Sequence, residues 1–196
     1  ALYGKRLLEA VTQIPVEVDI ASEFRYRAPI IPEGSIAIPV TQSGETADTL
    51  EATRIAKEKG ATILSIINVV GSSISRISDS VLYLRAGVEI GVASTKAYTA
   101  QLTAFALLAL WLAERRSAIS PVGTRLFTQE LTALSRQIKW CLDHDDAIKA
   151  CAEDPRFRDA NSTFFIGRGY NYPSALEGAL KLKEISYIHA EGYGAG

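Results

Sequence analysis

Residues 35–57 read SIAIPVTQSGETADTLEATRIAK, and this stretch decides the fold class. The apolar run at 35–40 predicts a buried strand, and the pattern from 46 to 59 predicts a helix that ends at Gly60. Hydroxyl residues and Gly44 fill the short turn between them. A strand, a tight turn and a helix in this order form the first part of an α/β unit.

The turn at 41–46 has the composition of an anion-binding site. A helix N-terminus offers unpaired N–H groups and a partial positive charge. The hydroxyls of Thr41, Ser43 and Thr46 add short donors, and Gly44 lets a ligand approach the backbone closely. We therefore predict that the turn holds a phosphate without Lys or Arg. A plain helix N-cap fits these residues equally well, because Ser and Thr are favoured there without any ligand.

The rest of the chain alternates between strand and helix patterns. Residues 61–67 form a continuous apolar, β-branched run, which is typical of a strand covered on both faces. The alternation predicts a parallel sheet with helices on both faces and binding sites at the carboxyl ends of its strands. Further strands are expected at 16–20, 80–84 and 162–166, and further helices at 1–13, 22–27, 94–116, 120–152 and from 172 onward.

The composition excludes several classes of function. The chain has 196 residues, 47% hydrophobic and 22% charged, and a net charge of −1 with no basic stripe for nucleic acid. Cys141 and Cys151 lack the spacing of a zinc or disulfide framework, so we expect no metal and a reducing cytoplasm. The apolar run at 102–113 falls short of the ~20 residues that span a membrane, so we expect a core or subunit-interface helix and no membrane partner.

A second chemical pattern lies near the end of the chain. Glu177, Lys181 and Glu184 are separated by four and three residues, so they share one face of the helix predicted from 172. A carboxylate beside an ammonium can move a proton between neighbouring carbons while the ammonium polarises an oxygen. A solvated salt bridge explains the same spacing and is the commoner outcome. His189, taken alone, is more often structural than catalytic.

Four segments together resemble a known family. They are 21–27 (ASEFRYR), 42–50 (QSGETADTL), 91–97 (GVASTKA) and 176–196 (LEGALKLKEISYIHAEGYGAG). They resemble the sugar isomerase (SIS) fold and, more narrowly, the isomerase half of the glutamine–fructose-6-phosphate aminotransferases, also called glucosamine-6-phosphate synthases. The resemblance implies a three-layer α/β/α fold with a flavodoxin-like parallel sheet. It divides the chain into a first SIS unit (1–118) without its first strand, a helical connector (119–158) and the start of a second unit (159–196).

The resemblance also implies roles for individual residues. Gln42, Ser43 and Thr46 would bind the phosphate of a hexose 6-phosphate, with Thr41 where the family commonly has Ser. The backbone of Val92 and the side chain of Ser94 would contact the sugar. The catalytic group would consist of Glu184, which shuttles a proton between C1 and C2, Lys181 beside the reacting oxygens, and Glu177 in support.

The activity that the resemblance implies is the conversion of fructose 6-phosphate to glucosamine 6-phosphate. Ammonia from glutamine forms an imine with the open-chain ketose, which is then isomerised without a cofactor. Glutamine hydrolysis would belong to a separate glutaminase domain of the same polypeptide, and the enzyme would be a homodimer. The family's first strand would precede Ala1 and its ring-opening histidine would follow Gly196. We therefore expect a fragment that is inactive alone.

Two other functions fit the same sequence pattern. One is a related SIS-fold deaminase or deglycase that isomerises a sugar phosphate without glutamine. The other is a non-catalytic module that senses a sugar phosphate and regulates a partner. The pairing of Glu184 with Lys181 argues against the sensor, because a sensor needs no proton shuttle.

Overall fold

The computed structural model describes residues 1–196, which form two compact units. The first unit contains residues 1–9 and 14–108, and the second contains 10–13 and 109–196. Helices α1 (Leu2–Thr12) and α5 (Lys96–Arg115) contribute residues to both. The division of the chain at residues 118 and 158 stays a prediction.

The first unit is built on a parallel sheet. Strand β3 (Thr62–Ile67) pairs with β4 (Ser80–Tyr83) on one side. On its other side it pairs with β1 (Ile36–Ala37) and then β2 (Val40–Thr41) in continuous register. The predicted strand at 35–40 is therefore present in two pieces, and the break includes Pro39, which has no N–H to donate to a ladder.

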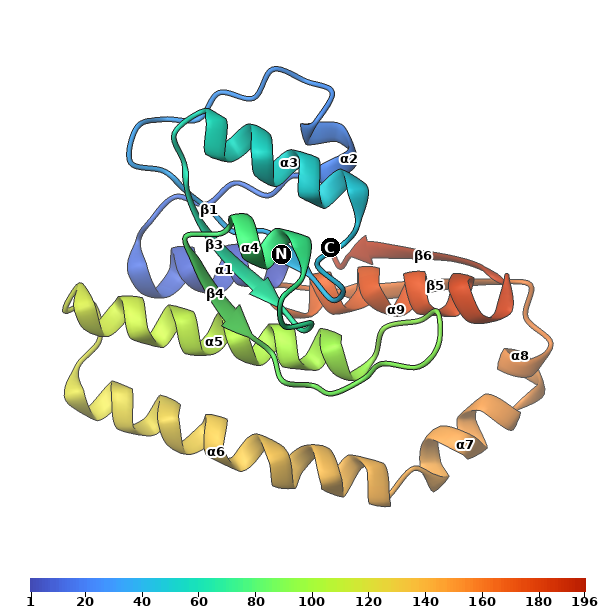
Figure 1. Ribbon diagram of the computed structural model, residues 1–196. Helices are drawn as coiled ribbons and strands as arrows, with labels where there is room; N and C mark the ends of the chain where they lie inside the picture. Colours follow the sequence, from blue (N-terminus) through green and yellow to red (C-terminus); the bar gives the residue numbers. More distant parts are fainter. The chain divides into compact units, whose positions relative to one another are not determined.

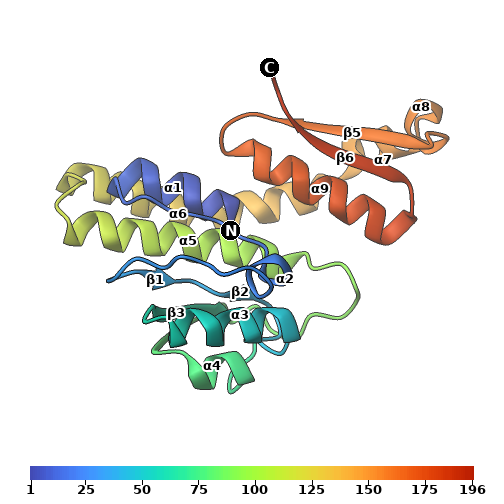
Figure 2. The same ribbon diagram turned by 90° about the horizontal axis from the view of Figure 1, so that it is seen from above.

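Helices cover both faces of this sheet, which confirms the predicted α/β architecture. In Figure 2, α3 (Ala47–Glu58) and α4 (Ser73–Ile77) lie on one side of the strands, and α1 and α5 lie on the other. The short helix α2 (Ala21–Phe24) packs on α3. Side chains of β3 form the centre of the core, and Ile63, Ile66 and Ile67 are fully buried.

The second unit contains a β-α-β motif preceded by three helices. The helices are α6 (Pro121–Asp143), α7 (Asp146–Glu153) and α8 (Pro155–Arg158). Strand β5 (Ser162–Gly167), helix α9 (Asn171–Ser186) and strand β6 (His189–Gly194) follow in that order. The two strands are parallel, and α9 packs along both of them (Figure 1).

The prediction of a strand at 16–20 is wrong. The alternation of apolar and polar residues is present, but the segment is extended coil with no partner strand. Its backbone is bonded instead to side chains of α1. The N–H of Val16 donates to Glu9 Oε1 at 3.0 Å, and the carbonyl of Val16 accepts from Lys5 Nζ. Strand pairing needs free backbone N–H and C=O groups, and those of Val16 are already bonded to α1.

Strand β6, which extends to Gly194, is not among the strands expected from the sequence. The glycines of this segment lower its strand propensity, so the sequence pattern did not predict it. Packing requires one of them: a Cβ on Gly192 would lie 2.8 Å from the Cα of Leu176 in α9. Gly192 therefore lowers the strand propensity of the segment and also allows α9 to approach β6.

Helix α5 is longer than the apolar run from which it was predicted. It has 20 residues, and by length and composition alone it could cross a membrane. This is weak evidence, because core helices of soluble proteins pass the same test. Ala97, Ala109 and Ala113 on this helix are fully buried, as in a core helix.

The contact between α1 and α5 gives a first prediction. A Cβ added to Gly4 would lie 2.4 Å from the ring of Phe105, which is itself 4% exposed and cannot move aside. Gly4→Ala should therefore destabilise the protein by about 1–3 kcal/mol, although Ala is the better helix former. Chemical denaturation measures the change. Gly194→Ala, where a Cβ meets nothing within 4 Å, is the control. Equal stability of the two variants would contradict the packing described here.

Candidate functional site

The turn at 41–46 lies where β2 ends, at the carboxyl edge of the sheet. Two of its hydroxyls shape the turn itself. Thr41 is 7% exposed, and its Oγ1 accepts the N–H of Gly44 at 3.2 Å. Ser43 Oγ accepts the N–H of Glu45 at 3.2 Å. The carbonyl of Gln42 accepts the N–H groups of two residues that follow β3, which fixes the start of the turn.

The N-terminus of α3 has no side-chain cap. Thr46 occupies the N-cap position, yet its hydroxyl makes no capping hydrogen bond. The first helical bond runs from the N–H of Leu50 to the carbonyl of Thr46 at 2.9 Å. The N–H groups of the first turn are therefore left without a protein acceptor, which is the arrangement that an anion completes. The plain capping alternative is not realised.

Helix α4 fixes the middle of the turn. Gly44 has φ +70°, and a Cβ there would lie 2.1 Å from Ser72 Oγ, so only glycine fits. The carbonyl of Gly44 accepts the N–H of Ile74 at 3.1 Å. Glu45 Oε1 accepts the N–H of Ser73 at 2.8 Å and thereby binds the N-terminus of α4. These bonds hold the turn in one conformation.

Acidic side chains near the turn all have partners. Asp48, in the first turn of α3, accepts a hydrogen bond from Arg25 at 2.7 Å. That bond raises the pKa of Arg25. Glu45 is engaged by α4, as described above. The turn thus has two carboxylates beside it, and each is drawn toward a donor from another element, which limits their repulsion of an anion.

The second predicted contact segment lies in the loop between β4 and α5. Val92 is 91% exposed. Ser94 Oγ donates to Glu89 Oε2 at 3.0 Å, and Glu89 Oε1 also accepts the N–H of Thr95 at 2.7 Å. Desolvation opposes ionisation of Glu89, but these hydrogen bonds outweigh it and lower its pKa. Glu89 therefore fixes the end of this loop on the N-terminus of α5.

The three predicted catalytic residues meet on α9. Lys181 Nζ lies 2.6 Å from Glu184 Oε2 and 3.4 Å from Glu177 Oε1. The side chains of Glu177, Lys181 and Glu184 are 25%, 20% and 30% exposed, so the group is largely shielded from water. Partial burial disfavours the ammonium of Lys181, but the bond to Glu184 and the two negative charges outweigh it and raise its pKa. A solvated surface pair would be far more exposed.

The structure therefore brings the predicted site residues together in two groups. The first unit contains one turn with Thr41, Gln42, Ser43 and Thr46. The same unit contains Val92 and Ser94, which lie in the separate loop between β4 and α5. The catalytic group lies in the second unit. Sequence reasoning did not assign roles to Arg25, Glu45 and Glu89, although all three lie in or beside the segments that carried the resemblance.

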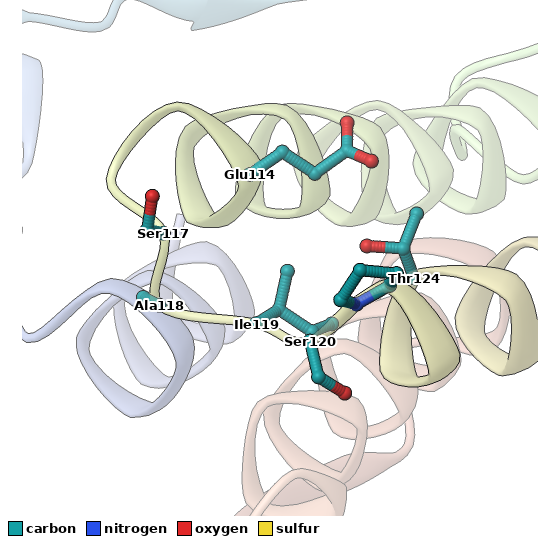
Figure 3. A pocket seen from close by; sticks show the side chains of 7 residues that line it. Glu114, Ser117, Ala118, Ile119, Ser120 and Thr124 are labelled. Carbon is teal, nitrogen blue, oxygen red and sulfur yellow. The ribbon is translucent and has the colours of Figure 1, made fainter.

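A separate hollow lies at the turn between α5 and α6. Figure 3 shows its lining, which comes from both helices and from the loop that joins them. Glu114 is its one ionisable residue, and Ser120 Oγ already accepts the N–H of Gly123 at 3.1 Å. None of the predicted site residues lines it. No group of three or more His, Cys, Asp or Glu side chains in the structure could hold a metal ion.

Comparisons with known proteins identify the family of the chain. The model of the SIS domain family matches residues 1–111 and 156–196. Glutamine–fructose-6-phosphate aminotransferases (isomerizing) of Chlorobaculum tepidum and Methanosarcina acetivorans are each 53% identical over 99% and 100% of this chain. The chain spans 31% of the length of each relative.

A solved structure is also similar. It is the C-terminal domain of glucosamine-fructose-6-phosphate aminotransferase from Francisella tularensis, which is 44% identical, with a TM-score of 0.94. The match covers 98% of this chain and 54% of that one.

The bond between Glu45 and α4 predicts a dependence of stability on pH. Hydrogen bonds from the hydroxyl and the N–H of Ser73 lower the pKa of Glu45. A lowered pKa contributes stability above the ordinary value of 4.5, and this contribution is lost as pH falls through the folded-state value. The difference in free energy of unfolding between wild type and Glu45→Gln should be constant near neutrality and change as the solution is acidified below that value.

Urea titrations between pH 7 and pH 3 measure this difference. Glu58→Gln, at the exposed end of α3, is the matched control and should show a smaller pH dependence. Parallel curves for Glu45→Gln and wild type over the whole range would mean that the carboxylate does not stabilise the turn.

Proposed function

We propose, from the premise that this chain belongs to the SIS domain family, that it is the sugar-phosphate isomerase portion of a glutamine–fructose-6-phosphate aminotransferase. The whole protein would convert fructose 6-phosphate and glutamine-derived ammonia to glucosamine 6-phosphate, the entry of carbon into amino sugars and the hexosamine pathway. Since the chain spans about a third of its curated relatives, this activity belongs to the complete polypeptide.

The observation that carries the proposal is the 2.6 Å contact between Lys181 Nζ and Glu184 Oε2. In the proposed reaction the carboxylate of Glu184 takes a proton from C1 of the open-chain imine and returns it to C2. Lys181 stabilises negative charge on the neighbouring oxygen, and Glu177 orients Lys181 from one turn away. Partial burial of all three side chains supports this role over that of a surface salt bridge.

Binding of the phosphate is assigned to the turn at 41–46. The uncapped N-terminus of α3 and the hydroxyls of Ser43 and Thr46 supply donors, and Gln42 adds a side-chain amide. Thr41 supports the turn through its bond to Gly44. The backbone of Val92 and the hydroxyl of Ser94 would contact the sugar.

The partners follow from the same proposal. The glutaminase domain of the same polypeptide supplies ammonia, and no cofactor, nucleic acid or membrane takes part. We also propose a cytoplasmic homodimer. Leu107 and Trp111, one turn apart on α5, are 49% and 51% exposed, which supports a subunit contact on that helix. Both cysteines are free, which suits a reducing compartment.

The two alternatives differ from this proposal in testable ways. A sugar-phosphate sensor needs no proton-transferring pair, so Lys181 and Glu184 argue against it. A deaminase or deglycase would use the same pair without glutamine. Reading the gene upstream of Ala1 separates these cases, because a synthase requires a glutaminase domain with an N-terminal cysteine nucleophile. Absence of that domain from the parent protein would overturn the synthase assignment.

The proton-transfer role of Glu184 gives the next prediction. In the full-length protein, Glu184→Gln should lower turnover by about 10²- to 10⁴-fold, because the amide cannot accept the proton. Binding of fructose 6-phosphate, measured by calorimetry, should persist. Lys183→Ala, exposed on the same helix, is the control and should keep its activity. Unchanged turnover in Glu184→Gln would refute this role.

The phosphate-binding role of the turn is tested separately. Removing both hydroxyls in Ser43→Ala/Thr46→Ala should raise KM for fructose 6-phosphate by at least about tenfold, since each hydrogen bond to a charged group contributes roughly 1.5–3 kcal/mol. Thr62→Ala, at the opposite edge of the same sheet, is the control. A KM equal to that of wild type would show that the phosphate binds elsewhere.

A further inference from the structure

Asn68 is a buried polar residue that follows β3 and contacts two loops. It is 9% exposed. Its N–H donates to the carbonyl of Gln42 at 3.2 Å. Its Nδ2 donates to the carbonyl of Gly87 at 2.7 Å, and its Oδ1 accepts the N–H of Ala86 at 2.9 Å. The backbone of Asn68 therefore holds the turn at 41–46, and its side chain holds the loop that follows β4.

The polarity of these contacts admits one orientation of the amide. Its partners in the second loop are both backbone groups, a carbonyl and an N–H, whose roles as acceptor and donor are fixed. In a flipped amide, Oδ1 would face the carbonyl of Gly87, so that two acceptors meet, and Nδ2 would face the N–H of Ala86, so that two donors meet. Buried polar groups without partners are costly, so the side chain is locked in place.

The second loop has no other bond to the turn. No hydrogen bond joins 41–46 directly to 84–95, so Asn68 is the link between them. The far end of that loop is fixed on α5, where Glu89 accepts from Ser94 and Thr95. Near its start the loop is held by the N–H of Leu84, which donates to the carbonyl of Ile67 at 2.9 Å, and beyond that bond by the side chain of Asn68.

We propose that Asn68 is a positioning residue that sets the spacing between the phosphate-binding turn and the loop carrying Val92 and Ser94. This inference rests on the proposed function, in which the two segments bind the phosphate and the sugar of one hexose 6-phosphate. Its consequence is specific. Loss of the side-chain bonds weakens binding of a ligand that spans both segments, and leaves binding of inorganic phosphate, which needs the turn alone, nearly unchanged.

Asn68→Asp tests the inference in the full-length protein. The substitution keeps the shape, the acceptor for Ala86 and the backbone bond to Gln42, but it replaces the donor to Gly87 with an oxygen. KM for fructose 6-phosphate should rise about tenfold or more, because an unpaired acceptor and a repulsive contact are created. In Asn68→Ser, which breaks both loop bonds without adding a charge that would repel the anion, the inhibition constant of inorganic phosphate should change less than about threefold. Asn161→Asp, exposed before β5, is the control.

Measuring KM at several pH values separates this role from a general destabilisation of the fold, which would not give the expected pH dependence. Protonation of the introduced carboxyl restores a donor to Gly87, so the ratio of the variant's KM to that of wild type should fall as pH decreases. If Asn68→Asp does not fold, Asn68→Ser replaces it and should show the rise in KM without the change in the phosphate constant.

Two results would overturn the role of Asn68. In the first, KM and the phosphate constant of Asn68→Ser rise by the same factor. In the second, neither changes. A wild-type protein that does not convert fructose 6-phosphate would instead overturn the proposed function, and that result is obtained before any variant is compared.

Discussion

The parallel pairing of β3 with β2 and β4 is the constraint on which the candidate binding site depends. Thr41, Ile67 and Tyr83 are aligned across the three strands, so the strands end at one level. Three connections consequently leave the sheet at the same edge. They are the hydroxyl turn, the segment that begins with Asn68, and the loop toward α5. A shift of one residue in β3 would displace Asn68 from both of its partners and bury the wrong side chains.

The proposed phosphate site at 41–46 contains no Lys or Arg within the turn itself. A turn flanked by Glu45 and Asp48 would repel a phosphate if those carboxylates faced it freely. Instead, Glu45 accepts from the N-terminus of α4 and Asp48 accepts from Arg25. The donors that remain for an anion are the N–H groups at the start of α3, the hydroxyls of Ser43 and Thr46 and the side-chain amide of Gln42. The acidic residues near the turn thus form hydrogen bonds that connect it to the surrounding elements.

The sequence predicted those features that depend on neighbouring residues. The apolar run of β3, the end of α3 before Gly60 and the i, i+4, i+7 grouping of Glu177, Lys181 and Glu184 all follow from local sequence signals. Features that depend on distant contacts were missed. Gly192 of β6 is required because α9 lies against it, and the backbone of Val16, at the start of the alternating segment 16–20, is bonded to α1 side chains and not to a strand. The function of Asn68 likewise becomes visible only when its partners are known.

The sharing of one ammonium by two carboxylates bears on how the proposed catalysis proceeds. In the proposed reaction, a Lys181 paired with Glu184 alone would become an unpaired, partly buried charge when Glu184 turned toward the substrate. Here Glu177, 3.4 Å from Lys181 Nζ, remains a partner throughout such a movement. On this proposal, Lys181 keeps a carboxylate partner while Glu184 takes the proton and the ammonium contacts the oxygen that gains charge. The proposed role of Glu177 would then account for a third member in a group whose proton transfer needs two.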